Sequence, residues 1–131
     1  MNPAEQVWQQ LRDRSWWSGP QLFVVIDDYE LVATNSGNPL ASLAEKLPYA
    51  RDVGVRFIVA RNAAGASRAM YEPFMQRMKE LGGQGVILSG SPAEGDIMGN
   101  VRARPMPPGR GTFVSRKRGN PLIQVGWYPG Q

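Results

Sequence analysis

The chain has 131 residues, of which 42% are apolar and 20% are charged, enough for one globular domain with a core. It contains no cysteine and no histidine, which excludes thiol chemistry, a Ser-His-Asp relay and a His/Cys zinc site. No apolar run approaches the roughly 18–20 residues of a membrane-spanning helix. The formal net charge is +4.

The first predicted elements are a helix and a strand. Residues 3–14 have apolar side chains at helical spacing and Pro3 in a first turn, which predicts a helix. Residues 22–26 are five consecutive apolar residues. Such a run is typical of a strand buried on both faces, as in a parallel sheet.

Two acids, Asp27 and Asp28, follow this strand at once. They would lie at its carboxyl end, where open α/β sheets place their ligands. A hydrophobic strand that ends in Asp-Asp has the form of a Walker B motif, in which the first acid holds Mg²⁺ through water and the second orients the attacking water. The alternative is a strand whose exposed end is capped by acidic turn residues.

A second helical segment and a second strand come next. Apolar residues at helical spacing predict a helix that starts near Pro39, breaks at Pro48 and continues as a short turn through Arg51. Residues 55–60 form another apolar run. The order strand, helix, strand is a βαβ crossover, which favours a parallel pair.

An amphipathic helix is predicted after a loop of small residues. Its apolar stripe consists of Tyr71, Phe74, Met75, Met78 and Leu81. Pro73 must lie in its first turn. A stripe of Met and aromatic residues packs into a core more often than it binds a partner. Four of these five residues, Tyr71, Phe74, Met75 and Met78, are nevertheless the best candidates in the chain for an apolar groove that binds a peptide.

The last third mixes short elements with loops. Residues 85–89 predict a third strand, and Ser91 caps a predicted short helix over 92–98, with Glu94 at the capping-box position. After an extended loop rich in Pro and Gly, residues 112–115 and 122–127 predict a terminal β-hairpin.

Basic residues gather late in the chain: Arg102, Arg104, Arg110, Arg116, Lys117 and Arg118. Such a cluster could meet nucleic acid, nucleotide phosphates or an acidic neighbour, or it could be a solvated loop face. No aromatic interleaving or recognition-helix pattern accompanies these arginines, so no nucleic-acid partner is expected.

Four segments together resemble a known family: 22–32, 47–73, 85–101 and 106–116. They are similar to the carboxyl-terminal part of an FtsK/SpoIIIE-type ATPase domain, and more narrowly to the last ATPase domain of the EccC component of type VII (ESX) secretion systems. The resemblance implies an α/β fold: part of a RecA-like P-loop NTPase core, with a mostly parallel sheet flanked by helices and a C-terminal β-hairpin. Residues 1–131 are then the C-terminal portion of one such domain.

The resemblance also implies a function. EccC proteins are ring-forming, hexameric motors on the cytoplasmic side of the inner membrane that export WXG100-type proteins and bind the export signal in their C-terminal tails. ATP and Mg²⁺ would be bound in the complete domain. A DNA translocase of the wider FtsK branch is the alternative.

Three site residues follow from the same resemblance. Asp27 and Asp28 take the Walker B positions, although FtsK-type motors usually carry Glu at the second. Asn62 falls at the glutamine of the motors' Thr-Gln-Arg motif, and Ala63 replaces the arginine.

One expected motif is absent: the sequence contains no G-x-x-x-x-G-K-[ST] loop to hold phosphates. The chain alone is therefore expected to be inactive as an ATPase and to bind neither ATP nor Mg²⁺ tightly. It is expected to be a fragment or a truncated product. One side of its sheet would lack a partner strand, which predicts association with itself or with the missing half.

Overall fold

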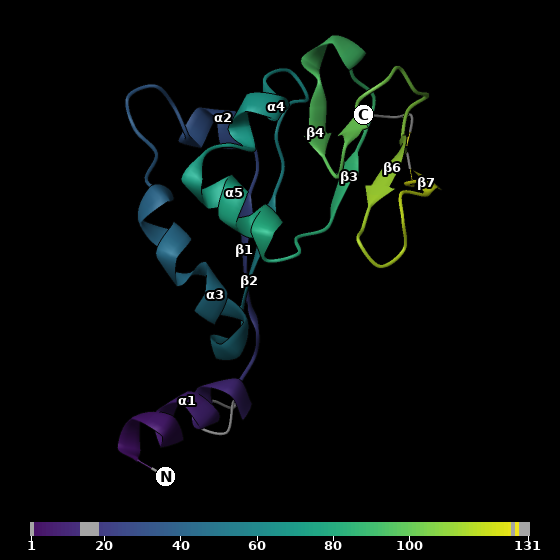
Figure 1. Cartoon of the computed structure of the whole chain (residues 1–131). Helices are drawn as coiled ribbons and strands as arrows, with labels where there is room; N and C mark the ends of the chain where they lie inside the picture. The colour runs from purple at the N-terminus through teal and green to yellow at the C-terminus, as the bar shows by residue number, and fades with distance from the viewer. Residues whose placement is uncertain (1, 14–18, 127, 129–131) are drawn as a thin grey trace. The chain divides into compact units, whose positions relative to one another are not determined.

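The computed structural model describes residues 2–13, 19–126 and 128 (Figure 1). The chain divides into two compact units, Met1–Ala60 and Arg61–Gln131. Each unit is described by itself below. No helix in the described part of the chain is long and apolar enough to cross a bilayer.

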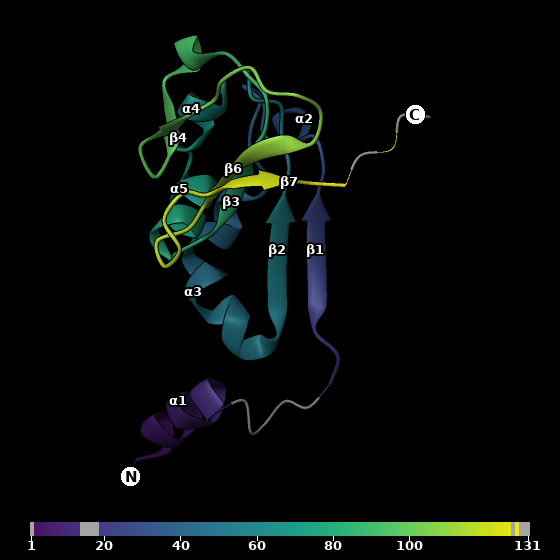
Figure 2. The ribbon, with the colours of Figure 1, turned by 90° about the vertical axis from the view of Figure 1, so that its right-hand side faces the viewer.

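The first unit is built on a parallel strand pair. β1 (Leu22–Ile26) pairs with β2 (Val55–Val59) in parallel, with Leu22 opposite Val55 and Ile26 opposite Val59 (Figure 2). The parallel pair predicted from the βαβ spacing is thus confirmed. The predicted N-terminal helix is α1 (Pro3–Asp13), and Arg14 lies outside the described residues.

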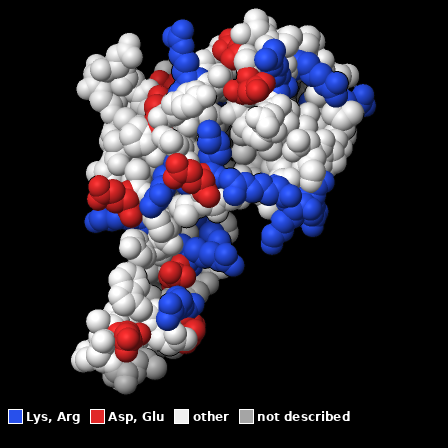
Figure 3. All heavy atoms as spheres, viewed as in Figure 1, with Lys and Arg blue, Asp and Glu red and all other residues white. Residues whose placement is uncertain are grey.

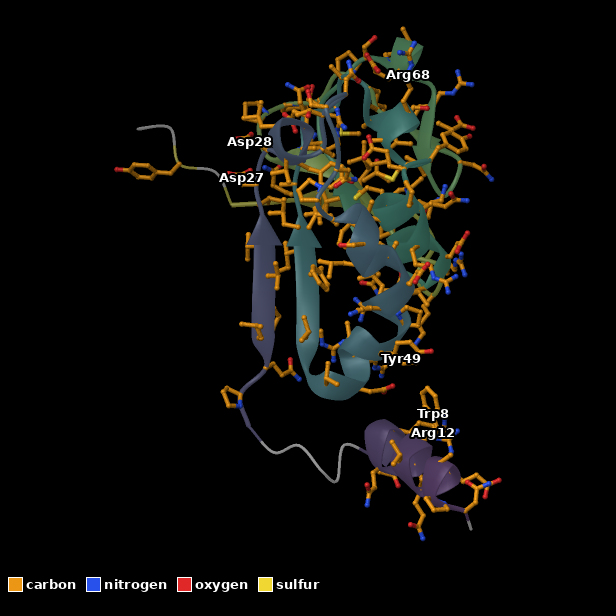
Figure 4. All side chains as sticks on the ribbon, turned by 90° about the vertical axis from the view of Figure 1, so that its left-hand side faces the viewer. Trp8, Arg12, Asp27, Asp28, Tyr49 and Arg68 are labelled. Atoms are coloured by element: carbon orange, nitrogen blue, oxygen red, sulfur yellow. The ribbon has the colours of Figure 1, made fainter. Side chains whose placement is uncertain are left out.

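Short helical turns connect the two strands. They are α2 (Tyr29–Val32), η1 (Ala41–Lys46), α3 (Leu47–Ala50) and η2 (Arg51–Val53). At Pro48, where a break was predicted, the helical path continues but changes from the 3-10 form of η1 to the α form of α3, with Pro48 in the first turn of α3. Gly54 ends η2 in a left-handed conformation, with φ 74°. The Trp8 ring of α1 lies on the Tyr49 ring, with centroids 5.6 Å apart (Figure 4).

β1 is not buried on both faces, so that prediction is wrong. Leu22, Phe23 and Val25 are 60%, 56% and 66% exposed. Among the described strands β1 pairs with β2 alone. A strand with one hydrogen-bonded neighbour in its own chain keeps an open edge, whatever its apolar content.

The second unit contains two helices, α4 (Ala66–Ala69) and α5 (Pro73–Glu80). Its described strands are β3 (Gly85–Ile87), β4 (Asp96–Met98), β5 (Val101–Arg102), β6 (Arg110–Val114) and β7 (Leu122–Gln124). An antiparallel sheet has the order β3-β6-β7, and β4 pairs antiparallel with β5. The predicted terminal hairpin is therefore confirmed as β6–β7, except that Trp127 lies outside the described residues.

The helix predicted over 92–98 is wrong. A single 3-10 turn, η3 (Pro92–Glu94), is followed by strand β4. Ser91 does cap this turn, since its side chain accepts a hydrogen bond from the Ala93 N–H at 3.2 Å. Gly95, with φ 84° and ψ −170°, turns the chain out of helical geometry.

Five buried residues of the second unit form one hydrophobic cluster: Ala66, Ile87, Ile97, Ala103 and Val114. Met70, Met98 and Val101 pack against it. The chain is an α/β protein, as predicted, with antiparallel pairs in addition to the parallel pair.

Candidate functional site

Asp27 and Asp28 lie directly after β1, at the carboxyl end of the parallel strand pair (Figure 4). Both side chains are exposed. Asp28 adopts a left-handed backbone conformation, with φ 50° and ψ 51°, which Asp tolerates better than most residues. Its N–H donates a hydrogen bond to Asp27 Oδ1 at 2.9 Å. The two acids thus form a compact turn at the strand end.

The backbone of Ala60, which follows β2, holds both ends of this acidic turn. The Ala60 N–H donates to the Ile26 carbonyl at 2.9 Å, and the Tyr29 N–H donates to the Ala60 carbonyl at 3.0 Å. Ile26 and Tyr29 are the residues on either side of Asp27 and Asp28. The second strand therefore fixes the position of the acids on the first.

These two carboxylates fit a hydrated Mg²⁺. This ion is usually held by one or two carboxylates together with waters and substrate phosphates. No cluster of three or more His, Cys, Asp or Glu residues that could hold a metal occurs in the described ranges. The donor set accordingly suits an ion shared with a nucleotide rather than a metal cage made by the protein.

Asn62 belongs to the second unit and lies in a loop that is closed on itself. Asn62 Oδ1 accepts from the Ala64 N–H at 2.9 Å. The Arg61 guanidinium donates to the carbonyls of Asn62 and Ala64 at 2.9 and 2.8 Å. The side-chain oxygen of Asn62, the third residue predicted to bind nucleotide, thus accepts a hydrogen bond within its own loop.

The four residues predicted as a peptide-binding face do not share one environment. Phe74 is 0% and Met75 is 8% exposed, so both are interior residues. This agrees with the alternative interpretation of the stripe, in which its residues pack into a core. Tyr71 precedes α5 and is 74% exposed. Met78 is half-buried. Only Tyr71 among them is presented freely at the surface.

The late basic residues are mostly exposed. Arg102 forms an ion pair with Asp96 at 2.8 Å. Arg104, Arg110 and the run 116–118 are exposed. On the face drawn in Figure 3, basic side chains are interspersed with acidic ones. This mixture fits a solvated surface.

A comparison with protein-family models finds no match. The ESX-4 secretion system protein EccC4 of Mycobacterium tuberculosis is 51% identical over 128 residues, 97% of this chain and 10% of that protein. The solved cytoplasmic domain of the Thermomonospora curvata type VII secretion ATPase EccC matches with a TM-score of 0.84 and 50% identity, over 98% of this chain and 14% of that chain. EccC ATPases 2 and 3 of the same organism, solved with a signal sequence peptide, match with a TM-score of 0.84 and 50% identity, over 98% of this chain and 22% of that one.

Parallel strands that carry two acids at their carboxyl end, in a fold shared with solved ATPase domains, define part of a P-loop NTPase core. The chain belongs to the EccC family of type VII (ESX) secretion ATPases. It spans about a tenth of the length of its curated relative, since it covers 10% of EccC4.

Proposed function

We propose that this chain supplies the Walker B half of the nucleotide site in the last ATPase domain of an EccC-type secretion motor. The observation that supports this role is the fixed, exposed Asp27–Asp28 turn at the end of a parallel strand. The motor would work as a hexameric ring on the cytoplasmic side of the inner membrane. Support for this location comes from the Thermomonospora curvata relative, of which the solved part is a cytoplasmic domain.

Each acid has a distinct task in this proposal. Asp27 holds a water of hydrated Mg²⁺, and Asp28 accepts a hydrogen bond from the attacking water and so orients it. When bound, Mg²⁺ neutralises charge that develops on the phosphates. The phosphates themselves need a P-loop, which this sequence does not contain. ATP and Mg²⁺ would therefore bind in a complete domain and not tightly to these residues alone.

Substitution of the first acid tests the proposal. In a complete EccC-type ATPase domain that contains these residues, Asp27→Asn should lower kcat by about 100-fold, because a neutral amide holds hydrated Mg²⁺ poorly. The measurement is steady-state phosphate release at saturating Mg-ATP.

Asp13→Asn on α1 is the matched control, because it removes the same charge from another exposed aspartate. It should leave kcat unchanged. Equal rates for Asp27→Asn and the unsubstituted domain would show that the acidic turn does not contribute to ATP hydrolysis. Calorimetric titration of Mg-ATP into the 131-residue chain should give no heat.

We further propose that the complete motor binds the C-terminal export signal of a WXG100-type protein. Support comes from the Thermomonospora curvata relative, which was solved with a signal sequence peptide. The exposed side chain of Tyr71 is this chain's candidate contact.

A further inference from the structure

Tyr29, the residue directly after the acidic turn, is fully buried although it follows two exposed acids. Its side chain is 0% exposed. Its hydroxyl oxygen accepts a hydrogen bond from Asn38 Nδ2 at 3.0 Å. A buried phenol normally needs such a polar partner. The side chain is therefore anchored at both its ring and its hydroxyl.

Asn38 holds its amide in one orientation. Asn38 Oδ1 accepts from the Leu40 N–H at 2.9 Å, so the Nδ2 donors face Tyr29. The preceding turn is closed by two backbone hydrogen bonds between Thr34 and Gly37, at 3.1 and 3.0 Å. Asn38 therefore directly follows a turn whose backbone geometry is fixed. This fixed amide can hold the phenol in place.

The acids have no buried anchor of their own. Asp27 and Asp28 are exposed, and Asp28 occupies the sparsely populated left-handed region. On the N-terminal side the β1–β2 ladder holds Ile26. On the C-terminal side the chain passes into α2, which has only four residues. Two contacts of Tyr29 fix that side: its N–H donates to the Ala60 carbonyl at 3.0 Å, and its ring is buried.

We propose that Tyr29 and Asn38 are positioning residues of the Walker B turn. Through the Tyr29 ring and backbone they keep Asp28 in its left-handed conformation, and so keep Asp27 directed at hydrated Mg²⁺ and Asp28 at the attacking water. This inference rests on the proposed nucleotide site. Neither residue touches the nucleotide in this role, so the KM for ATP should stay the same.

Loss of the hydroxyl contact should weaken the response to Mg²⁺. In a complete EccC-type domain, Tyr29→Phe and Asn38→Ala should each raise the Mg²⁺ concentration for half-maximal hydrolysis about tenfold, as outer partners of metal ligands commonly do. The double variant should be no worse than either single one, because both remove one interaction. Tyr49→Phe, a tyrosine of α3 with 46% exposure, is the matched control and should have no effect.

A conservative exchange separates positioning from general stability. Asn38→Asp keeps an oxygen for the Leu40 N–H and offers a carboxylate oxygen to the Tyr29 O–H, so it should restore the Mg²⁺ response to within about twofold of the unsubstituted domain. If Asn38→Asp is as impaired as Asn38→Ala at equal thermal stability, the positioning role is overturned.

The conformation of the turn is measured apart from activity, in the 131-residue chain by NMR. A strong NOE between the amide and α protons of Asp28 should report a positive φ, and Tyr29→Phe should shift that amide resonance and weaken the NOE. An unchanged Asp28 signal in a folded Tyr29→Phe chain overturns the inference. If Asp27→Asn leaves hydrolysis intact while Tyr29→Phe still changes the Asp28 signal, the proposed nucleotide site is wrong. The positioning of Asp28 by Tyr29 is then still supported.

Discussion

Tyr71 is the one residue of the predicted peptide-binding stripe that the fold leaves at the surface. It is 74% exposed, and Lys79 Nζ lies 5.4 Å from the centroid of its ring. A large exposed ring of this kind is the side chain most often found at the centre of a protein interface. Phe74, three residues later, is fully buried and packs in the protein interior.

Alanine substitutions of Tyr71 and of Phe74 should therefore have different effects. Tyr71→Ala should weaken binding of a fluorescent export-signal peptide to the complete motor about tenfold, with unchanged thermal stability. Phe74→Ala should instead lower stability by about 3–5 kcal/mol, because it empties a core site. Fluorescence anisotropy and thermal unfolding are the measurements. Unchanged affinity in Tyr71→Ala would place the peptide elsewhere.

Single residues differ in how far sequence could place them. Asp27 and Asp28 could be located because two charged residues directly follow an apolar run. A buried strand does not continue through two charged residues, so the strand must end there. Tyr29 could not be assigned a role, because an aromatic residue after the acids has the same appearance whether it is buried or exposed. Its burial and its bond to Asn38 depend on chain folding across nine positions.

The Glu94 side chain links two elements that lie far apart in the sequence. Its Oε2 accepts from the Gly65 N–H at 2.8 Å, which connects η3 to the residue that precedes α4. The capping-box pattern had assigned this side chain to Ser91 instead. A carboxylate takes the N–H partner that tertiary packing offers, and Gly65, with φ 78°, presents its N–H there.

Removal of this carboxylate should destabilise the second unit. Glu94→Ala should lower the free energy of unfolding by about 1–2 kcal/mol, because the Gly65 N–H loses a charged acceptor, and Glu94→Gln should cost less. Glu80→Ala is the control, since Glu80 forms only an exposed pair with Arg77, at 3.2 Å. Urea unfolding measures all three. Equal losses for Glu94→Ala and Glu80→Ala would contradict this connection.

Elements with strong local signals were predictable, and those set by partners were not. β1 and β2 are apolar runs with clear ends, and Gly54 marks the boundary before β2. The stretch 92–98 has helical composition, yet Ile97 is 7% exposed in the core as part of strand β4. A strand of three residues has too few positions for a period of two to be recognised.

At the scale of the whole molecule, one edge of β1 has no partner strand among the described residues. The Leu22 N–H donates to Gly54 and the Ile26 carbonyl accepts from Ala60, so these residues face β2. Because backbone groups alternate along a strand, those of Phe23 and Val25 face the opposite edge. Sequence predicted burial of β1 because apolar composition does not distinguish burial within a chain from burial against another.

This edge should make the isolated chain self-associate. An apolar edge strand without Lys or Pro pairs readily with another strand, and two copies of β1 can meet antiparallel, which keeps the acids of one copy away from those of the other. Val25→Lys places a charge at a position that is 66% exposed, so it should leave the fold intact and shift the chain toward monomer. Sedimentation velocity at several concentrations is the measurement. Leu31→Lys, on α2 and 73% exposed, adds the same charge away from the edge and should leave association unchanged. If the unsubstituted chain is monomeric throughout, or if both lysine variants dissociate alike, the β1 edge is not the surface that binds.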